Sequence, residues 1–316
     1  MKERSIRVRV PATSANLGPG FDALGIACSL YNEMTLTLTE SSGLEIRARG
    51  EGAPYIPSDE RNIVWKSICY LLQRAGRVDE FRGAKIYMSN RIPLSRGLGS
   101  SATAIVAGLT AANALLDKPF SKQDLLQMAT DIEGHPDNVA PAIYGGFTVN
   151  TVTDGIVECF SFLPRIFMRF VVMVPDFYLS TKSARQVLPA EVPMRDAVFN
   201  ISHAAMMVAA LARGSEQHLE NAFSDALHQH YRAALIPGMF DVFAAAKKAG
   251  AYGAALSGAG PCLIAFVPEH RRCTEAVAAA MRDAFRAHDV EARPLHLRMD
   301  TKGAHILRRR SMPANK

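Results

Sequence analysis

The chain has 316 residues, of which 48% are hydrophobic and 21% are charged, and its formal net charge is +6. This balance excludes a disordered chain and leaves room for two domains or one large one. With no zinc-finger spacing and no aromatic RNA-binding motif, the modest positive charge argues against nucleic acid as a partner.

The five cysteines are widely separated and contain no CxxC pair, so we expect reduced thiols rather than a disulfide framework. The charged N-terminus lacks the apolar region of a signal peptide, and no apolar run approaches the ~20 residues of a membrane span. We therefore expect a cytoplasmic protein that does not bind membranes.

Alternating apolar residues predict a first strand from about Ile6 that ends at Pro11. The stretch PATSANLGPGFDALG that follows is expected to be a loop, in which Asn16 and Asp22 lie among glycines. Taken alone, this loop is better interpreted as a turn held by side-chain hydrogen bonds than as a site. A strand pair is then expected between residues 34 and 48, followed by a helix at 64–72.

The stretch PLSRGLGSSAT lies between a predicted strand at 84–88 and a predicted helix at 105–116. Its glycines let the backbone approach a ligand, and the first amides of a helix attract anions. We therefore predict a nucleoside triphosphate site here, although a glycine-rich turn with a serine N-cap explains the loop alone equally well. A Walker P-loop is excluded because Gly99, not lysine, precedes Ser100. The residues of this loop are Pro93, Leu94, Ser95, Arg96, Gly97, Leu98, Gly99, Ser100, Ser101, Ala102 and Thr103.

A capped helix from Ser121 leads into EGHPDNVAPAIYGG, where a shaped loop is predicted because Gly134 and Pro136 interrupt the helix. This loop concentrates an acid, a titratable ring and an amide. Carboxylates without a cysteine set favour magnesium or substrate hydrogen bonds over zinc. The polar side chains concerned are Glu133, His135, Asp137 and Asn138.

A second domain is expected to begin between Asp154 and Pro164, with a buried strand at 170–174. An ordinary charged loop with Thr181 and Arg185 should follow. Helices are then predicted at 195–213 and 216–230, and the histidines within them are most simply surface or core residues.

The stretch ALSGAGPCLIAFV predicts a tight turn between two apolar strands, where the backbone can approach a ligand. After it we expect an alanine-rich helix to about residue 284 and a final strand with Leu295 and Leu297. The basic run at 308–310 is predicted to be a solvated tail.

Together the four glycine-containing stretches resemble the GHMP kinase superfamily, whose nucleotide loop reads PxxxGLGSSA. Within it, the first and third stretches are similar to those of homoserine kinases, whereas mevalonate and galactose kinases have a lysine in the first motif. The match spans most of residues 5–268 and keeps the order and spacing of the motifs.

The resemblance implies an α+β protein with the two-domain GHMP kinase fold. Residues 1–160 would form an ATP-binding domain of the ribosomal protein S5 domain 2-like type with a left-handed βαβ crossover. Residues 161–316 would form a ferredoxin-like domain. Homodimer formation is kept as an open expectation.

The implied reaction is transfer of the γ-phosphoryl group of ATP to the side-chain hydroxyl of L-homoserine, with Mg²⁺ as cofactor. Ser101 and Glu133 would hold the metal, and the loop 93–103 would wrap the phosphates. The residues that the resemblance assigns to catalysis are Asp137, Glu133 and Arg185. Those that it assigns to the acceptor are Asn16, Asp22, His135, Asn138, Thr181, Arg185, Arg232 and Gly258.

The aspartate that many relatives are thought to use as a base corresponds to Asp137, but the lysine that accompanies it is absent from the neighbourhood of Asn16. We therefore expect catalysis by positioning and phosphate stabilisation, with the base role open. Two alternatives remain: a GHMP kinase for another small alcohol, such as shikimate or a mevalonate-like compound, and a nucleotide-binding regulator without activity.

Overall fold

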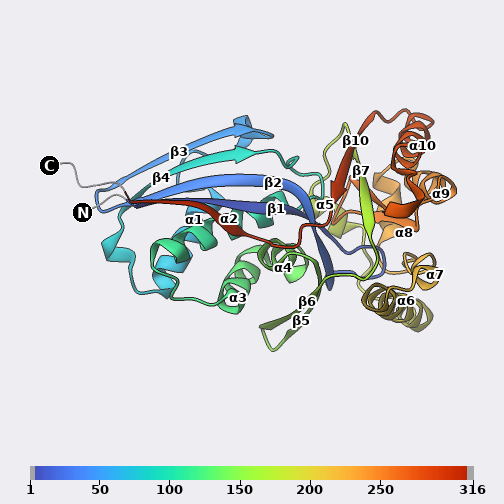
Figure 1. Cartoon of the computed structure of the whole chain (residues 1–316), viewed down its shortest axis with the longest axis horizontal. Coiled ribbons are helices and arrows are strands. Elements are labelled where there is room, and N and C mark those ends of the chain that lie inside the picture. Colours follow the sequence, from blue (N-terminus) through green and yellow to red (C-terminus); the bar gives the residue numbers. More distant parts are fainter. Residues whose placement is uncertain (1–3, 312–316) are drawn as a thin grey trace.

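The computed structural model describes residues 4–311, which form two β-sheets with helices packed on them. In Figure 1 the first half of the chain forms one end of an elongated molecule and most of the second half forms the other. A hydrophobic cluster with members from both sheets joins the two ends; it includes Ile26, Phe147 and Phe170.

The larger sheet has seven strands and carries the order β11-β1-β2-β4-β3, with β5 paired to β2 and β6 paired to β5. The expected direct pairing of the strands within residues 34–48 is wrong, because β4 lies between β2 and β3. β3 pairs with β4 in parallel, and α1 connects them. This is the βαβ unit to which the expected crossover belongs. The bounds are β1 Arg4–Ala15, β2 Leu24–Thr39, β3 Gly43–Gly50, α1 Ile63–Arg74, β4 Gly83–Asn90, β5 Phe147–Thr153, β6 Ile156–Phe162 and β11 His305–Ser311.

The first strand does not end at Pro11, as expected, but continues to Ala15. Its pairing with β2 shifts register between Pro11 and Ala12. An irregularity of this kind accommodates a proline, which has no N–H to donate to the ladder. The loop that follows is therefore shorter than predicted and begins at Asn16.

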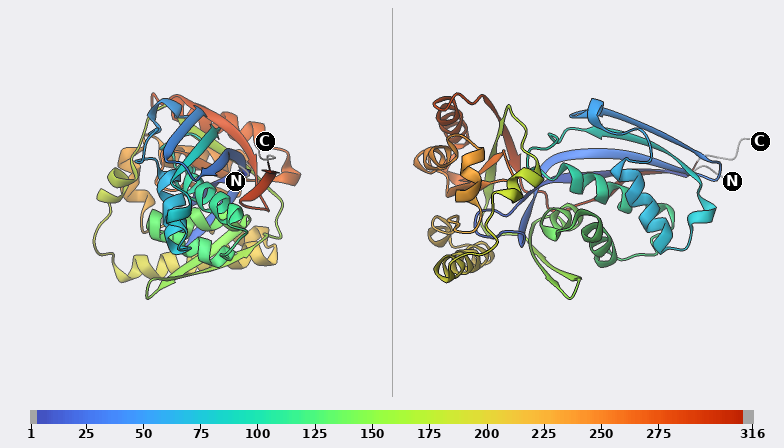
Figure 2. Two further views of the ribbon diagram at one scale, coloured as in Figure 1. Left: turned by 90° about the vertical axis from the view of Figure 1, so that its left-hand side faces the viewer. Right: turned by 180° about the vertical axis from the view of Figure 1, so that it is seen from behind.

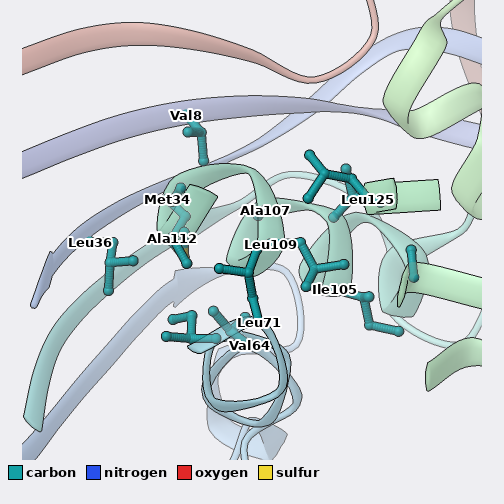
Figure 3. Packing of buried hydrophobic residues seen from close by; sticks show 14 of the residues in the cluster. Val8, Met34, Leu36, Val64, Leu71, Ile105, Ala107, Leu109, Ala112 and Leu125 are labelled. Atoms are coloured by element: carbon teal, nitrogen blue, oxygen red, sulfur yellow. The ribbon is translucent and has the colours of Figure 1, made fainter. Parts of the chain in front are cut away.

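The helices α1, α2, α3 and α4 cover one face of this sheet, as Figures 1 and 2 show. α2 lies at the centre and is buried on nearly every side, so it has no pronounced polar face. Figure 3 shows side chains of α1 and α2, including Leu71, Ile105 and Leu109, in the cluster with sheet residues. The further helical bounds in this half are η1 Ala53–Tyr55, η2 Val78–Glu80, α2 Ser100–Leu115, α3 Lys122–Glu133 and α4 Pro136–Tyr144.

The smaller sheet has the order β10-β7-β9-β8, with each neighbouring pair antiparallel. Along the chain the strands and the helices between them follow the β-α-β-β-α-β order of the ferredoxin-like fold. α9 and α10 pack on one face through the cluster that contains Val242, Met281 and Phe285. The bounds are β7 Met168–Pro175, α5 Thr181–Gln186, α6 Met194–Arg213, α9 Met239–Lys248, β8 Gly253–Leu256, β9 Leu263–Pro268, η4 Glu269–Arg271, α10 Thr274–Arg286 and β10 Ala292–Arg298.

The helix predicted at 216–230 is interrupted. Only α7 (Glu216–Leu219) and α8 (Gln229–Arg232) form, and η3 (Ala233–Leu235) follows α8. Asp225 explains part of the break, because its carboxylate accepts hydrogen bonds from the backbone N–H groups of Leu227, His228 and Gln229 at 2.9, 3.1 and 2.6 Å. Such local bonds compete with a continuous helix.

The basic run at 308–310 is not a tail, because it lies in β11, which pairs antiparallel with β1. The C-terminal half thus supplies one strand to the N-terminal sheet. The boundary predicted between residues 160 and 161 falls inside β6, and the domain limits stay a prediction.

Candidate active site

Three of the four glycine-containing stretches converge through backbone and serine contacts. The N–H of Thr13 in β1 donates to the carbonyl of Leu98 at 3.2 Å, and Gly258 N–H donates to Ala15 at 3.1 Å. The hydroxyl of Ser257 donates to the carbonyl of Gly97 at 2.6 Å. These contacts bring the N-terminal loop, the loop 93–103 and the turn between β8 and β9 to the edge of one cavity of about 480 Å³.

Two glycines let the loop 93–103 pack this closely. Gly97 and Gly99 have φ values of +79° and +66°, which favour glycine. A Cβ at Gly97 would lie 2.0 Å from the carbonyl oxygen of Ser257, and one at Gly99 would lie 1.9 Å from Oγ1 of Thr13. Gly99, rather than a serine, is the N-cap of α2, and no side chain caps that helix. The first amides of α2 are therefore available to an anion.

Most of the predicted nucleotide loop lines the cavity, but three of its residues do not. Leu98 and Ala102 are buried in the hydrophobic cores. Pro93 borders a neighbouring cavity. The lining members are Leu94, Ser95, Arg96, Gly97, Gly99, Ser100, Ser101 and Thr103.

Ser101 and Glu133 meet as expected at the start of α2. Glu133 is the last residue of α3, which ends at Gly134 with φ +94°. The Ser101 hydroxyl donates to Oε2 of Glu133 at 2.8 Å, and burial raises the pKa of the Glu133 carboxyl. A hydroxyl and a carboxylate beside an anion site are oxygen donors of the type that Mg²⁺ prefers, and few protein ligands are needed when phosphates supply others.

His135, Asp137 and Asn138 also line the cavity, but the predicted loop is wrong here. Pro136 begins α4, so Asp137 and Asn138 lie in the first turn of a helix. Nδ1 of His135 lies 2.6 Å from Oδ1 of Asp137, which is 1% exposed. This contact raises the pKa of His135. Thr13 donates to Oδ1 of Asn138 at 2.8 Å and fixes its amide.

At the other end of the cavity, Asp22 and Arg185 form a two-pronged ion pair. The guanidinium nitrogens of Arg185 lie 3.0 and 2.9 Å from the carboxylate oxygens of Asp22, and this contact raises the pKa of Arg185. Asn16 supports the loop, because its Oδ1 accepts from the Asp22 N–H and its Nδ2 donates to the carbonyl of Gly258. Thr181 and Arg185 lie in the short helix α5 and not in the predicted charged loop.

Arg232 lines the same end, although its residue is only 1% exposed. Its Nε donates to the carbonyl of Ala184 at 3.0 Å, and one terminal nitrogen lies 3.3 Å from the carbonyl of Gly258. Burial, together with the nearby charge of Arg185, lowers the pKa of Arg232 to about 10. All the predicted acceptor residues therefore border one cavity.

One part of the cavity lining was missed from the sequence. Its lining residues include Tyr55, Ile56, Pro57, Asn62, Ile63 and Asn90. They come from the connection after β3, the start of α1 and the end of β4, which no motif brings together. Asn62 carries only the signal of a helix cap, which it is: its Oδ1 accepts from Val64 N–H at 2.9 Å.

Comparisons with known proteins identify the family. Residues 62–146 match the family GHMP kinases N terminal domain, and residues 207–287 match GHMP kinases C terminal. A homoserine kinase of Desulfitobacterium hafniense is 44% identical over 302 residues, which cover 96% of this chain and 100% of the relative. The chain belongs to the homoserine kinase family of GHMP kinases. A homoserine kinase of Carboxydothermus hydrogenoformans is 46% identical and covers 94% of this chain and 95% of its own length.

Solved structures agree with this membership. The crystal structure of homoserine kinase from Cytophaga hutchinsonii has a TM-score of 0.87 at 31% identity and covers 96% of this chain and 97% of its own. A mevalonate kinase with a TM-score of 0.67 at 17% identity shares the fold. The expected two-domain α+β GHMP kinase fold is confirmed, and kinases of this family use ATP. Within residues 4–311, no helix is long and apolar enough to cross a bilayer.

Proposed function

We propose that this chain transfers the γ-phosphoryl group of ATP to the side-chain hydroxyl of L-homoserine, which gives O-phospho-L-homoserine and ADP in threonine biosynthesis. The observation that carries the proposal is the pairing, in one cavity, of an open helix start with a carboxylate and two guanidinium groups. The open helix start suits the phosphates of a nucleotide. The carboxylate and the guanidinium groups suit the ammonium and carboxylate groups of an amino acid.

The ion pair between Asp22 and Arg185 accounts for recognition of a zwitterion. Both side chains are partly open, at 35% and 40% exposure, and each now neutralises the other. The ammonium group of L-homoserine would take the place of Arg185 beside Asp22, and its carboxylate would face Arg185 and Arg232. Shikimate and mevalonate carry a carboxylate but no ammonium group, so they would compete with Asp22 for Arg185 and supply nothing to replace that counter-ion.

The N-terminus of α2 would hold the phosphates. The amides of Ser100 and Ser101 begin a helix that no side chain caps, and the helix dipole adds roughly half a positive charge there. Ser101 and Glu133 would hold Mg²⁺, which when bound neutralises charge on the β and γ phosphates. Both protein groups are already joined at 2.8 Å.

Asp137 would align the acceptor hydroxyl rather than remove its proton. Its Oδ1 is engaged by Nδ1 of His135, whose raised pKa favours the imidazolium form, so this oxygen already has a hydrogen-bond partner. No lysine accompanies it near Asn16. The proton would leave late, or pass to the transferred phosphate.

Asp137→Asn should therefore lower kcat only a few-fold and leave the KM values of both substrates near their wild-type levels. Steady-state kinetics with ATP and L-homoserine measure this. General base catalysis typically contributes 10²- to 10⁴-fold, so a fall in kcat of about 100-fold or more with intact binding would establish Asp137 as the base.

The test of the proposed function is magnesium-dependent ADP release with L-homoserine, D-homoserine, shikimate, mevalonate, galactose and no acceptor. We expect selective turnover with L-homoserine. Turnover with another alcohol would overturn the acceptor assignment, and ADP release no greater than without acceptor would favour a non-catalytic regulator. The cytoplasmic location stays a prediction that the five free cysteines support. Homodimer formation stays a prediction as well.

A further inference from the structure

His228 joins the N-terminal loop to Arg232, although the proposed phosphoryl transfer assigns no role to this side chain. Its side chain is fully buried, and its ring stacks on Phe21 with a centroid distance of 5.2 Å. Nε2 lies 2.8 Å from the carbonyl oxygen of Gly18, and Nδ1 lies 3.2 Å from a terminal nitrogen of Arg232. The two ring nitrogens therefore face groups from the two halves of the chain.

These contacts select one protonation state of the ring. A guanidinium has donors and no acceptor, so Nδ1 must accept from Arg232. A backbone carbonyl only accepts, so Nε2 must carry the proton and donate to Gly18. The neutral ring protonated at Nε2 satisfies both contacts, whereas the imidazolium would turn an N–H toward the guanidinium.

The surroundings support the neutral ring. Burial lowers the pKa of His228, and the positive charge of Arg232 acts in the same direction. Asp225, the hydrogen bond to Gly18 and Asp22 oppose this shift, and the carboxylate of Asp225 lies 3.6 Å from Nε2. Its carboxylate is already engaged by three backbone N–H groups at the start of α8.

Arg232 connects this ring to the rest of the acceptor end. It donates to the carbonyl of Ala184, which precedes Arg185, and to the carbonyl of Gly258, which also accepts from Asn16. Its guanidinium lies over the ring of Phe21, 5.4 Å from the centroid. Nη1 of Arg232 makes the contacts to both His228 and Gly258, so without the contact at Nδ1 only the carbonyls of Ala184 and Gly258 would hold the guanidinium.

We propose that His228 is a positioning residue for acceptor binding, which holds the Arg232 guanidinium toward the carboxylate of the amino acid by accepting a hydrogen bond at Nδ1. The proposal rests on L-homoserine as the acceptor. His228 itself touches neither substrate. The His228 ring thereby strengthens the binding of L-homoserine and leaves the binding of ATP unchanged.

Two variants separate the two ring nitrogens. In His228→Asn the side-chain oxygen can replace Nδ1 as acceptor, whereas in His228→Gln the longer amide reaches toward Gly18 and leaves Arg232 without its partner. His230→Gln is the matched control, because that neighbouring histidine is exposed and its ring lies tilted against that of Tyr231. All three are measured in the full chain by calorimetric titration with L-homoserine, in the presence of a saturating non-hydrolysable ATP analogue.

We expect His228→Gln to raise the Kd of L-homoserine roughly 10-fold, as for loss of a hydrogen bond to a charged group, with the Kd of the ATP analogue unchanged. His228→Asn should recover most of the loss, and the control should match the wild type. Equal losses for both ligands, or none, would overturn the positioning role. If the wild-type chain bound no L-homoserine, the proposed function would fail first, and this proposal with it.

The pH dependence of the Kd of L-homoserine gives a second test, because a purely structural role of His228 would not change it. Protonation of His228 removes its acceptor, so the Kd of L-homoserine should rise as pH falls through a pKa below that of an ordinary histidine. His228→Asn should lack this acidic rise while it keeps every other titrating group of the cavity, including His135. Superimposable pH profiles for the two proteins would contradict the proposal.

Discussion

Glu133→Gln should lower kcat/KM for phosphoryl transfer by roughly 10²- to 10³-fold, the usual loss when one stabilising group is removed from a developing charge. Glutamine keeps an oxygen that can accept from Ser101, so the 2.8 Å contact can persist while the negative charge is lost. Steady-state kinetics over a series of Mg²⁺ concentrations measure the effect. The variant should need more Mg²⁺ for half-maximal rate.

Asp131→Asn is the matched control for this experiment, because Asp131 is an exposed carboxylate on the same helix α3 that pairs with Tyr70 outside the cavity. It should behave like the wild type. Burial raises the pKa of Glu133, so protons should compete with the metal at a higher pH than at an ordinary glutamate. The Mg²⁺ requirement of the wild type should therefore rise as pH falls, and that of Glu133→Gln should not. An equal rise in both would remove Glu133 from the metal site.

Gly99→Ala should cause a large loss of ATP affinity. The new Cβ would lie 1.9 Å from Oγ1 of Thr13 and 3.0 Å from Oδ1 of Asn138, and neither neighbour can move freely because both are buried. The start of α2 would have to shift away from β1. We expect the KM of ATP to rise at least 10-fold, on the order of 1.4 kcal/mol of binding free energy.

Gly155→Ala separates this clash from backbone strain. Gly155 lies in the turn between β5 and β6 with φ +78°, close to the +66° of Gly99, but nothing lies within 4 Å of its would-be Cβ. The free energy of unfolding of Gly155→Ala should fall only by the ~1–2 kcal/mol that an L-residue costs in the left-handed region. Its ATP kinetics should match those of the wild type. Urea unfolding and ATP titration of both variants test this. If Gly99→Ala matched Gly155→Ala in both measurements, the close packing of the loop on β1 would not contribute to ATP binding.

The nucleotide end of the site could be predicted because its parts are contiguous. A glycine-rich turn and the helix start that follows it lie within eleven residues, and the anion site is a property of that local backbone. Glu133 could be assigned only through the family resemblance, since nothing between residues 101 and 133 indicates that the two ends of that segment meet. The structure brings them within hydrogen-bond distance.

The acceptor end depends on contacts that local patterns do not encode. Arg185 and Arg232 resemble ordinary surface charges in the sequence, yet both lie within 6 Å of the ring of Phe21. His228 had no motif at all and was interpreted as a surface or core residue. The residues around Asn62 come from the connection after β3, the start of α1 and the end of β4, and no local pattern predicts that they line one cavity.

The errors in secondary structure have a common physical cause. Periodicity measures the tendency of one segment, whereas Pro11 is carried within β1 by a shift of register against β2, which a single segment cannot reveal. The break at Asp225 likewise depends on one carboxylate that finds three nearby N–H groups. In both cases a contact with another group, β2 or the Asp225 carboxylate, outweighed the conformational preference of the segment itself.

The pairing of β11 with β1 has a consequence for biosynthesis on the ribosome. β1 (Arg4–Ala15) is translated long before one of its two neighbours, residues 305–311. Until those residues leave the exit tunnel, β1 has β2 on one side and an unpaired strand edge on the other. The sheet that carries the nucleotide loop is therefore completed only after residues 305–311 have been made, so a nascent chain arrested before residue 305 would expose a template for aggregation rather than a finished domain.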